Sequence, residues 1–136
     1  MSFRFLDHTA DVQVECRAHD FPSLLEAAVD ALYAVCLARR RTDTGVLHSV
    51  ELTVYGDGTV DLYEETLIRW LQEMIYLVEK EGFVASRLAL RWIEDDARLV
   101  ADLDGYLCTP EERAEEVKSA TYHDLAVWRR EESWGA

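Results

Sequence analysis

A short polar stretch near the amino terminus contains side chains whose types and spacing could do chemistry. Asp7, His8, Thr9 and Asp11 lie close together between two segments whose alternating pattern predicts strands. Their two carboxylates offer the hard oxygen ligands that Ca²⁺, Mg²⁺ and Mn²⁺ prefer. Asp and Thr are also common in tight turns, where they accept hydrogen bonds from the turn's own backbone. The stretch therefore predicts either a divalent-metal site or a polar turn.

A second polar cluster runs from Val117 to His123 near the other end of the chain. Lys118 follows an acidic run, so its ammonium group is either part of a surface salt bridge or directed at a partner's carboxylate or a bound phosphate. Thr121 and His123 share one face of the strand expected here. A catalytic zinc site would need His8, His123 and an Asp, but no ligand spacing in the sequence brings these residues together.

The sequence lacks the usual marks of nucleophilic catalysis. No serine lies in a nucleophile-elbow motif, no cysteine is paired with a nearby histidine in a catalytic motif, and no glycine-rich loop could hold a phosphate. Cys16, Cys36 and Cys108 are odd in number and widely spaced, which predicts free thiols rather than disulfides or a zinc site. We therefore predict that the protein is not an enzyme by itself.

The charge balance limits the kinds of partner. The chain has 136 residues, with 27 acidic side chains against 14 basic ones and a formal net charge of −13. Such a field repels the phosphates of RNA and DNA, so direct nucleic-acid binding is not expected, whereas cations or a basic protein partner would be attracted. No apolar run approaches the ~20 residues that a membrane-spanning helix requires, so we expect a cytoplasmic protein without a membrane anchor.

Hydrophobic periodicity predicts one domain, residues 1–136, that contains both helices and strands. The expected strands are at 3–6, 12–18, 49–54, 88–92, 99–103 and 118–128, and the expected helices are at 21–38 and 60–80. This order favours an α+β fold, a two-layer sandwich of a mixed, largely antiparallel sheet with two long helices. Arg39, Arg40 and Arg41 follow the first helix, where cations complement the helix dipole, and a binding patch is the second interpretation. Residues 108–116 are expected to be an exposed connection or a short helix.

Three motifs together resemble the archease family, and the resemblance covers nearly the whole chain. They are Asp7-His8-Thr9-Ala10-Asp11-Val12, Trp70-Leu71-x-Glu73, and Val117-Lys118-x-Ala120-Thr121-Tyr122-His123. The resemblance implies an archease-like fold and a non-catalytic protein cofactor. Archeases assist the RtcB-type, GTP-dependent RNA ligase of tRNA splicing and RNA repair, by promoting its guanylylation and multiple turnover.

The resemblance also implies roles for single residues. Asp11, with Asp7, would belong to an acidic site for a divalent metal ion, calcium or alternatively magnesium or manganese. Lys118 would be the functional lysine of the last motif. The remaining polar residues would surround these groups, namely His8, Thr9, Thr121 and His123.

One departure from the family pattern concerns the last residues. Archeases usually continue into a further strand that ends in an Asp ligand, whereas this chain stops at Trp134-Gly135-Ala136. Either the family's last strand is absent from this protein, or Glu131, Glu132 or the terminal carboxylate replaces that ligand. Two other function classes remain open at this point, a general chaperone or assembly module and a small metal-dependent hydrolase.

Overall fold

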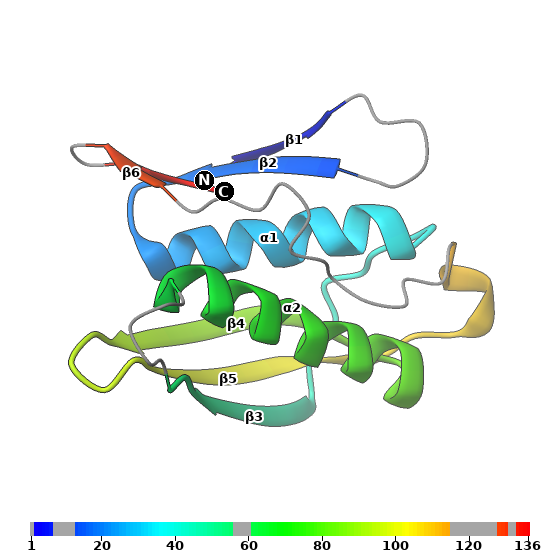
Figure 1. Cartoon of the computed structure of the whole chain (residues 1–136). Coiled ribbons are helices and arrows are strands. Elements are labelled where there is room, and N and C mark those ends of the chain that lie inside the picture. Colours follow the sequence, from blue (N-terminus) through cyan, green and yellow to red (C-terminus); the bar gives the residue numbers. More distant parts are fainter. Residues whose placement is uncertain (1, 7–12, 56–60, 115–127, 131–132) are drawn as a thin grey trace.

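The computed structural model describes residues 2–6, 13–55, 61–114, 128–130 and 133–136 (Figure 1). Two long helices alternate with strands along the chain. The described elements are β1 (Ser2–Leu6), β2 (Gln13–Ala18), α1 (Phe21–Cys36), β3 (Val46–Thr53), α2 (Leu62–Glu81), β4 (Phe83–Ile93), β5 (Arg98–Leu107), a short 3₁₀ helix η1 (Pro110–Glu112), β6 (Trp128–Arg130) and β7 (Ser133–Gly135). The α+β class and both long helices are confirmed. None of the described helices is both long and apolar enough to span a membrane.

The strands form two sheets instead of the single mixed sheet that we expected. One sheet has the order β1-β2-β7-β6 and the other has the order β3-β5-β4. Every pairing between the described strands is antiparallel. Alternation along a strand shows which face is buried but not which strand lies beside it, so the sequence pattern could not separate the two sheets.

Helix α1 lies between the two sheets (Figure 1). Asp20 caps its first turn, because Oδ1 of Asp20 accepts a hydrogen bond from the backbone N–H of Ser23 at 2.7 Å. The helix packs against β1, β2 and β7 of one sheet and against β4 and α2 on its other side. Its buried residues are Phe21, Leu24, Leu25, Ala27, Ala28, Val29, Ala31, Tyr33 and Cys36. They point in several directions, as expected for a helix that is covered on more than one side.

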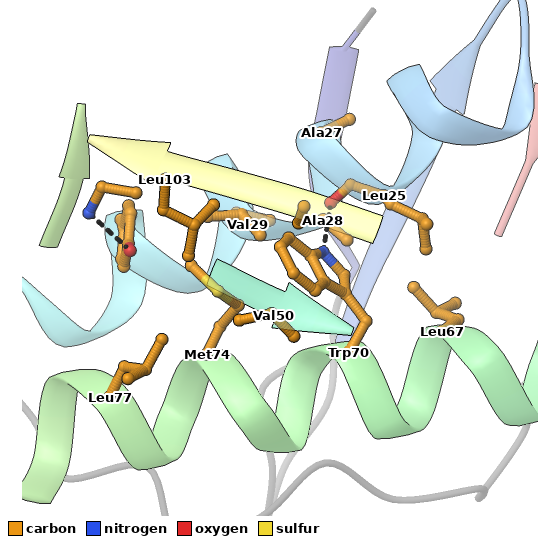
Figure 2. Packing of buried hydrophobic residues seen from close by; sticks show 14 of the residues in the cluster. Leu25, Ala27, Ala28, Val29, Val50, Leu67, Trp70, Met74, Leu77 and Leu103 are labelled. Atoms are coloured by element: carbon orange, nitrogen blue, oxygen red, sulfur yellow. Dashed lines mark hydrogen bonds between the residues drawn. The ribbon is translucent and has the colours of Figure 1, made fainter. Parts of the chain in front are cut away.

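Helix α2 presents one apolar face to the core (Figure 2). Asp61 caps its start by accepting from the N–H groups of Tyr63 and Glu64, and Gly82 ends it with the positive φ of 68° that glycine adopts easily. Trp70 is fully buried, and its Nε1 donates a hydrogen bond to the carbonyl oxygen of Leu25 in α1 at 3.0 Å. The tryptophan of the second motif therefore joins the two helices.

Strands β4 and β5 extend further than their alternation predicted, and they approach closely at Gly105. A Cβ atom at this position would lie 1.8 Å from the carbonyl oxygen of Val84, so only glycine fits without movement of the backbone. The neighbouring N–H of Ala85 donates to the Tyr33 hydroxyl of α1 at 2.9 Å. The three-stranded sheet is thereby held tightly against α1.

A cluster of aromatic rings connects the two sheets through the starts of the helices. The cluster consists of Phe21 from α1, Tyr63 from α2, Trp92 from β4 and Trp134 from β7, and its ring centroids are 5.0 to 5.9 Å apart. Phe21 contacts the other three rings. Edge-to-face contacts of this kind add stability beyond the burial of apolar area. The cluster attaches the short strand β7 to the core.

Replacement of Trp70 by Phe should destabilise the protein measurably. Trp70→Phe removes the hydrogen bond to Leu25 and leaves unfilled space in the core, so the free energy of unfolding should fall by about 2 kcal/mol. Urea denaturation measures this loss. Tyr76→Phe is the matched control, because Tyr76 lies on the exposed side of α2 and should change stability by less than about 0.5 kcal/mol. Equal losses in both variants would contradict the role given to Trp70.

Candidate functional site

The predicted site residues lie outside the described part of the chain. This holds for Asp7, His8, Thr9 and Asp11 of the first motif and for Lys118, Thr121 and His123 of the last motif. The metal-ligand and lysine assignments therefore stay predictions. The nearest described residues are Leu6 and Gln13 around the first motif and Ala114 and Trp128 around the last, and they show where the chain approaches and leaves each motif.

The first motif is bordered by two paired strands. Leu6, the last residue of β1, pairs with Gln13, the first residue of β2. The chain turns back towards α1 directly after β2, through His19 and Asp20. Strand β2 is about 20 Å long and α1 is about 24 Å long, so the Cys36 end of α1 returns to the end of the molecule where Leu6 and Gln13 lie (Figure 1).

The last motif is reached from the same end. Ala114, the last described residue before it, donates its N–H to the carbonyl oxygen of Cys36 at 2.9 Å. Leu37 forms a β-bridge with Arg113, and the carbonyl oxygen of Glu112 accepts from the N–H of Ala38 at 2.7 Å. Leu6, Gln13 and Ala114 therefore lie near the Cys36 end of α1, whereas Trp128, the first described residue after the last motif, pairs through β7 with the Arg17 end of β2.

Glu112 is the buried acidic residue of this region. Its Oε1 accepts from the backbone N–H of Thr109 at 2.9 Å and from the Thr109 hydroxyl at 3.1 Å, and its Oε2 accepts from Nε of Arg41 at 2.8 Å. The residue is 8% exposed. The hydrogen bond from the Thr109 backbone, followed by those from Arg41 and the Thr109 hydroxyl, lowers the pKa of Glu112 despite the opposing effect of burial. The carboxylate is therefore an ionised structural group.

Sequence reasoning missed Glu112, although a signal for it was present. Residues 108–116 were expected to be an exposed connection or a short helix, and the short helix exists as η1. The Thr-x-x-Glu spacing of Thr109 and Glu112 is typical of a capping box, and it indicates a glutamate that folds back onto the chain.

The interpretation of Arg39–Arg41 as cations that complement the dipole of a helix is wrong. Helix α1 ends at Cys36 and has no basic residue in its last turn. Arg40 instead binds Asp30 at 2.7 Å and lies over the ring of Tyr33, whereas Arg41 binds Glu112 and Asp43. The helix ends early because the chain after it forms hydrogen bonds with residues 112–114, a long-range contact that periodicity does not show.

The cysteines have the properties of core residues. Burial raises the pKa of the Cys16 thiol to about 11, and the same is true of Cys36. Burial also raises the pKa of Cys108. All three are free, and thiols that stay protonated are weak nucleophiles and weak metal ligands. Within the described ranges, no group of three His, Cys, Asp or Glu side chains could hold a metal ion.

The end of the chain forms more structure than expected. Residues 133–135 form β7, which pairs with both β2 and β6. Cys16 and Ala136 also exchange two backbone hydrogen bonds, at 2.6 and 2.9 Å. Trp134 is buried in the aromatic cluster. Glu131 and Glu132, the candidate replacement ligands, lie outside the described residues.

The arrangement of two antiparallel sheets around two helices is that of a solved structure, and the sequence matches a known family. The solution structure of Methanobacterium thermoautotrophicum protein 1598 is similar, with a TM-score of 0.76, 22% identity, and coverage of 98% of this chain and 94% of that one. The sequence profile of the Archease protein family matches residues 3–136. The chain therefore belongs to the archease family.

Archeases from several archaea are similar in sequence to this chain over most of their length. Protein archease of Archaeoglobus fulgidus is 29% identical over 137 residues, which cover 100% of this chain and 96% of that protein. Protein archease of Pyrobaculum neutrophilum is 32% identical over 140 residues, which cover 97% of this chain and 89% of that protein. Neither of these names states a catalytic activity.

Stability should depend on pH through Glu112. Because the folded-state pKa of Glu112 lies below its ordinary value of 4.5, its ionised form stabilises the fold above that value, and the stabilisation is lost as the pH falls through the lowered pKa. Wild type should therefore be more stable than Glu112→Gln at neutral pH, and the difference should shrink towards about pH 3. Urea denaturation at each pH measures the difference.

The matched control for this experiment is the neighbouring Glu111→Gln, because Glu111 is exposed. The free energy of unfolding of Glu111→Gln should differ little from that of wild type at any pH. Other carboxylates with lowered pKa values, such as Glu15 beside Arg4 and Arg17, act equally in all three proteins and cancel in the difference. A stability difference between wild type and Glu112→Gln that does not change with pH would contradict the assignment.

Proposed function

We propose that this protein is a protein cofactor of an RtcB-type, GTP-dependent RNA ligase, and that it promotes guanylylation and multiple turnover of the ligase in tRNA splicing or RNA repair. The observation that carries this proposal is the archease match over residues 3–136, which includes both polar motifs. The protein would act in the cytoplasm on the ligase itself. It would neither bind RNA directly nor associate with a membrane.

Two further observations support a contact through one acidic end of the molecule. Leu6 and Gln13, which flank the first motif, and Ala114, the last described residue before the last motif, lie near the Cys36 end of α1. The net charge of −13 favours encounter with a basic surface, such as the active-site mouth of an enzyme that binds RNA and GTP. We propose that the Asp11 end of the protein docks there.

Metal binding is a separate part of the proposal, and it depends on donor chemistry. Asp7 and Asp11 are hard oxygen donors, which suit calcium, magnesium or manganese better than a softer ion. The described residues form no metal site by themselves, so Asp7 and Asp11 would have to supply ligands to it. A bound ion would supply positive charge at this acidic end. Lys118, His8, Thr9, Thr121 and His123 would act around it by orienting partner groups.

Removal of the charged group of Asp11 or Lys118 should strongly reduce stimulation of the ligase. In a reconstituted multiple-turnover ligation assay, Asp11→Ala and Lys118→Ala should each lower the stimulation by at least about tenfold, because each removes a charged group from the proposed contact. The amount of product formed per ligase molecule is the measurement.

The matched controls for this assay are Asp96→Ala and Lys80→Ala, which remove one exposed charge of each sign from elsewhere on the surface. Both should stimulate as wild type does. If the Asp11 and Lys118 variants also stimulate fully, the assigned roles are wrong. Turnover of substrate without any ligase would instead indicate a small hydrolase, and suppression of aggregation of unrelated proteins by all variants would indicate a general chaperone.

A divalent ion should bind at Asp11. Titration calorimetry with CaCl₂, MnCl₂ and MgCl₂ should detect binding to wild type, and Asp11→Asn should weaken it by at least about tenfold, as expected when one of few oxygen ligands is lost. Asp96→Asn is the control and should bind as wild type does. Absence of binding to wild type, or unchanged binding to Asp11→Asn, would remove the metal from the proposal.

A further inference from the structure

Arg40 and Arg41 are neighbours in sequence that make the same three kinds of contact. Arg40 binds the carboxylate of Asp30 at 2.7 Å and the carbonyl oxygen of Ala85 at 3.3 Å, and its guanidinium lies 4.7 Å from the ring centre of Tyr33. Both partner residues belong to the central body of the protein, since Asp30 lies in α1 and Ala85 in β4. Arg40 therefore fastens α1 to the three-stranded sheet.

Arg41 makes the corresponding contacts with a different part of the chain. Its Nε binds the carboxylate of Glu112 at 2.8 Å, its Nη2 donates to the carbonyl oxygen of Leu107 at 3.2 Å, and its guanidinium lies 4.2 Å from the ring centre of Tyr106. It also forms an ion pair with Asp43, and its backbone N–H donates to the Tyr106 hydroxyl at 2.8 Å. The planar guanidinium suits this combination of stacking and hydrogen bonding, which lysine cannot reproduce.

Residues 109–114, which we call the anchor segment, are held at one point by Arg41. Glu112 binds Arg41 through Oε2 and Thr109 through Oε1, while its carbonyl oxygen accepts from Ala38. The anchor segment is also held through the ion pair of Arg113 with Glu79 of α2. Ala114 ends the segment with its hydrogen bond to Cys36, four residues before Lys118 in the sequence.

We propose that Arg41 is a positioning residue for ligase activation: by holding Glu112, it fixes the anchor segment against the end of α1 and thereby sets the place from which the chain continues to Lys118. This inference rests on the proposed function, because it assigns Arg41 an effect on the last motif. Arg41 itself touches neither a substrate nor a partner in this scheme. It acts through Glu112 and the backbone of the anchor segment.

The pair Arg41→Met and Arg40→Met provides a matched test. Both variants lose an arginine with a carboxylate, a carbonyl oxygen and a tyrosine ring as partners, but only Arg41 holds the anchor segment. In Arg41→Met, amide hydrogen exchange at Ala114 and Ala38 should become about tenfold faster than in wild type, because the charge-assisted contact that holds the anchor segment against the end of α1 is lost. Arg40→Met should leave the exchange of Ala114 close to that of wild type.

Ligase stimulation, titrated against protein concentration, separates positioning from general stability. A variant that is only less stable has a smaller folded fraction, so additional protein restores full stimulation. Arg41→Met should instead lower the plateau of stimulation by about tenfold, since displacement of a functional group by an ångström has effects of this size. Arg40→Met should reach the wild-type plateau.

Glu112→Gln tests the same contact from its other side and covers the case in which Arg41→Met does not fold. It should also lower the plateau, and the double variant should be no worse than the more severe single variant, because both residues act through one contact. Unchanged exchange at Ala114 in both single variants overturns the inference. A wild-type plateau of ligase stimulation in both single variants also overturns the inference. An equal loss of the plateau in Arg40→Met overturns it as well. If wild type itself does not stimulate the ligase, the proposed function fails first and the inference falls with it.

Discussion

The burial of α1 on two sides is the constraint on which the rest of the structure depends. A helix covered on one side needs one apolar stripe, but α1 packs against strands of both sheets and against α2. Small residues such as Ala27, Ala28 and Ala31 allow close approach where the helix is surrounded. Among the described elements, α1 packs against both sheets, and the aromatic cluster contains rings from both, so the position of α1 determines how both sheets lie. The carboxyl end of α1, near Leu6, Gln13 and Ala114, is fixed in the same way.

Several of the few basic side chains of this acidic protein hold the end of α1 in place. Only 14 basic side chains oppose 27 acidic ones, and Arg40, Arg41 and Arg113 are all engaged near the end of α1. They connect the helix end to β4, to η1 and to α2, respectively. Such contacts need a donor that is always charged and has several N–H groups, which is the chemistry of arginine. These three arginines thus serve the architecture at this end of α1.

The sequence predicted the local elements better than their long-range partners. Helices expected at 21–38 and 60–80 are found at Phe21–Cys36 and Leu62–Glu81, because helical periodicity and capping by Asp20 and Asp61 are local signals. The division of the strands into two sheets, the role of β7 and the burial of Glu112 depend on contacts between distant residues, which periodicity does not encode. The candidate site could be located in the sequence only as two motifs, and the structure adds that Leu6, Gln13 and Ala114 lie at the same end of α1.

The aromatic cluster also makes the docking of the two sheets visible to spectroscopy. Trp92 comes from the three-stranded sheet and Trp134 from the four-stranded one, and both rings lie within 6 Å of Tyr63. Rings in fixed asymmetric contact give rise to near-ultraviolet circular dichroism, which disappears when tertiary packing loosens although helices persist. The protein therefore carries its own optical reporter, without an added label, for any event that separates its sheets.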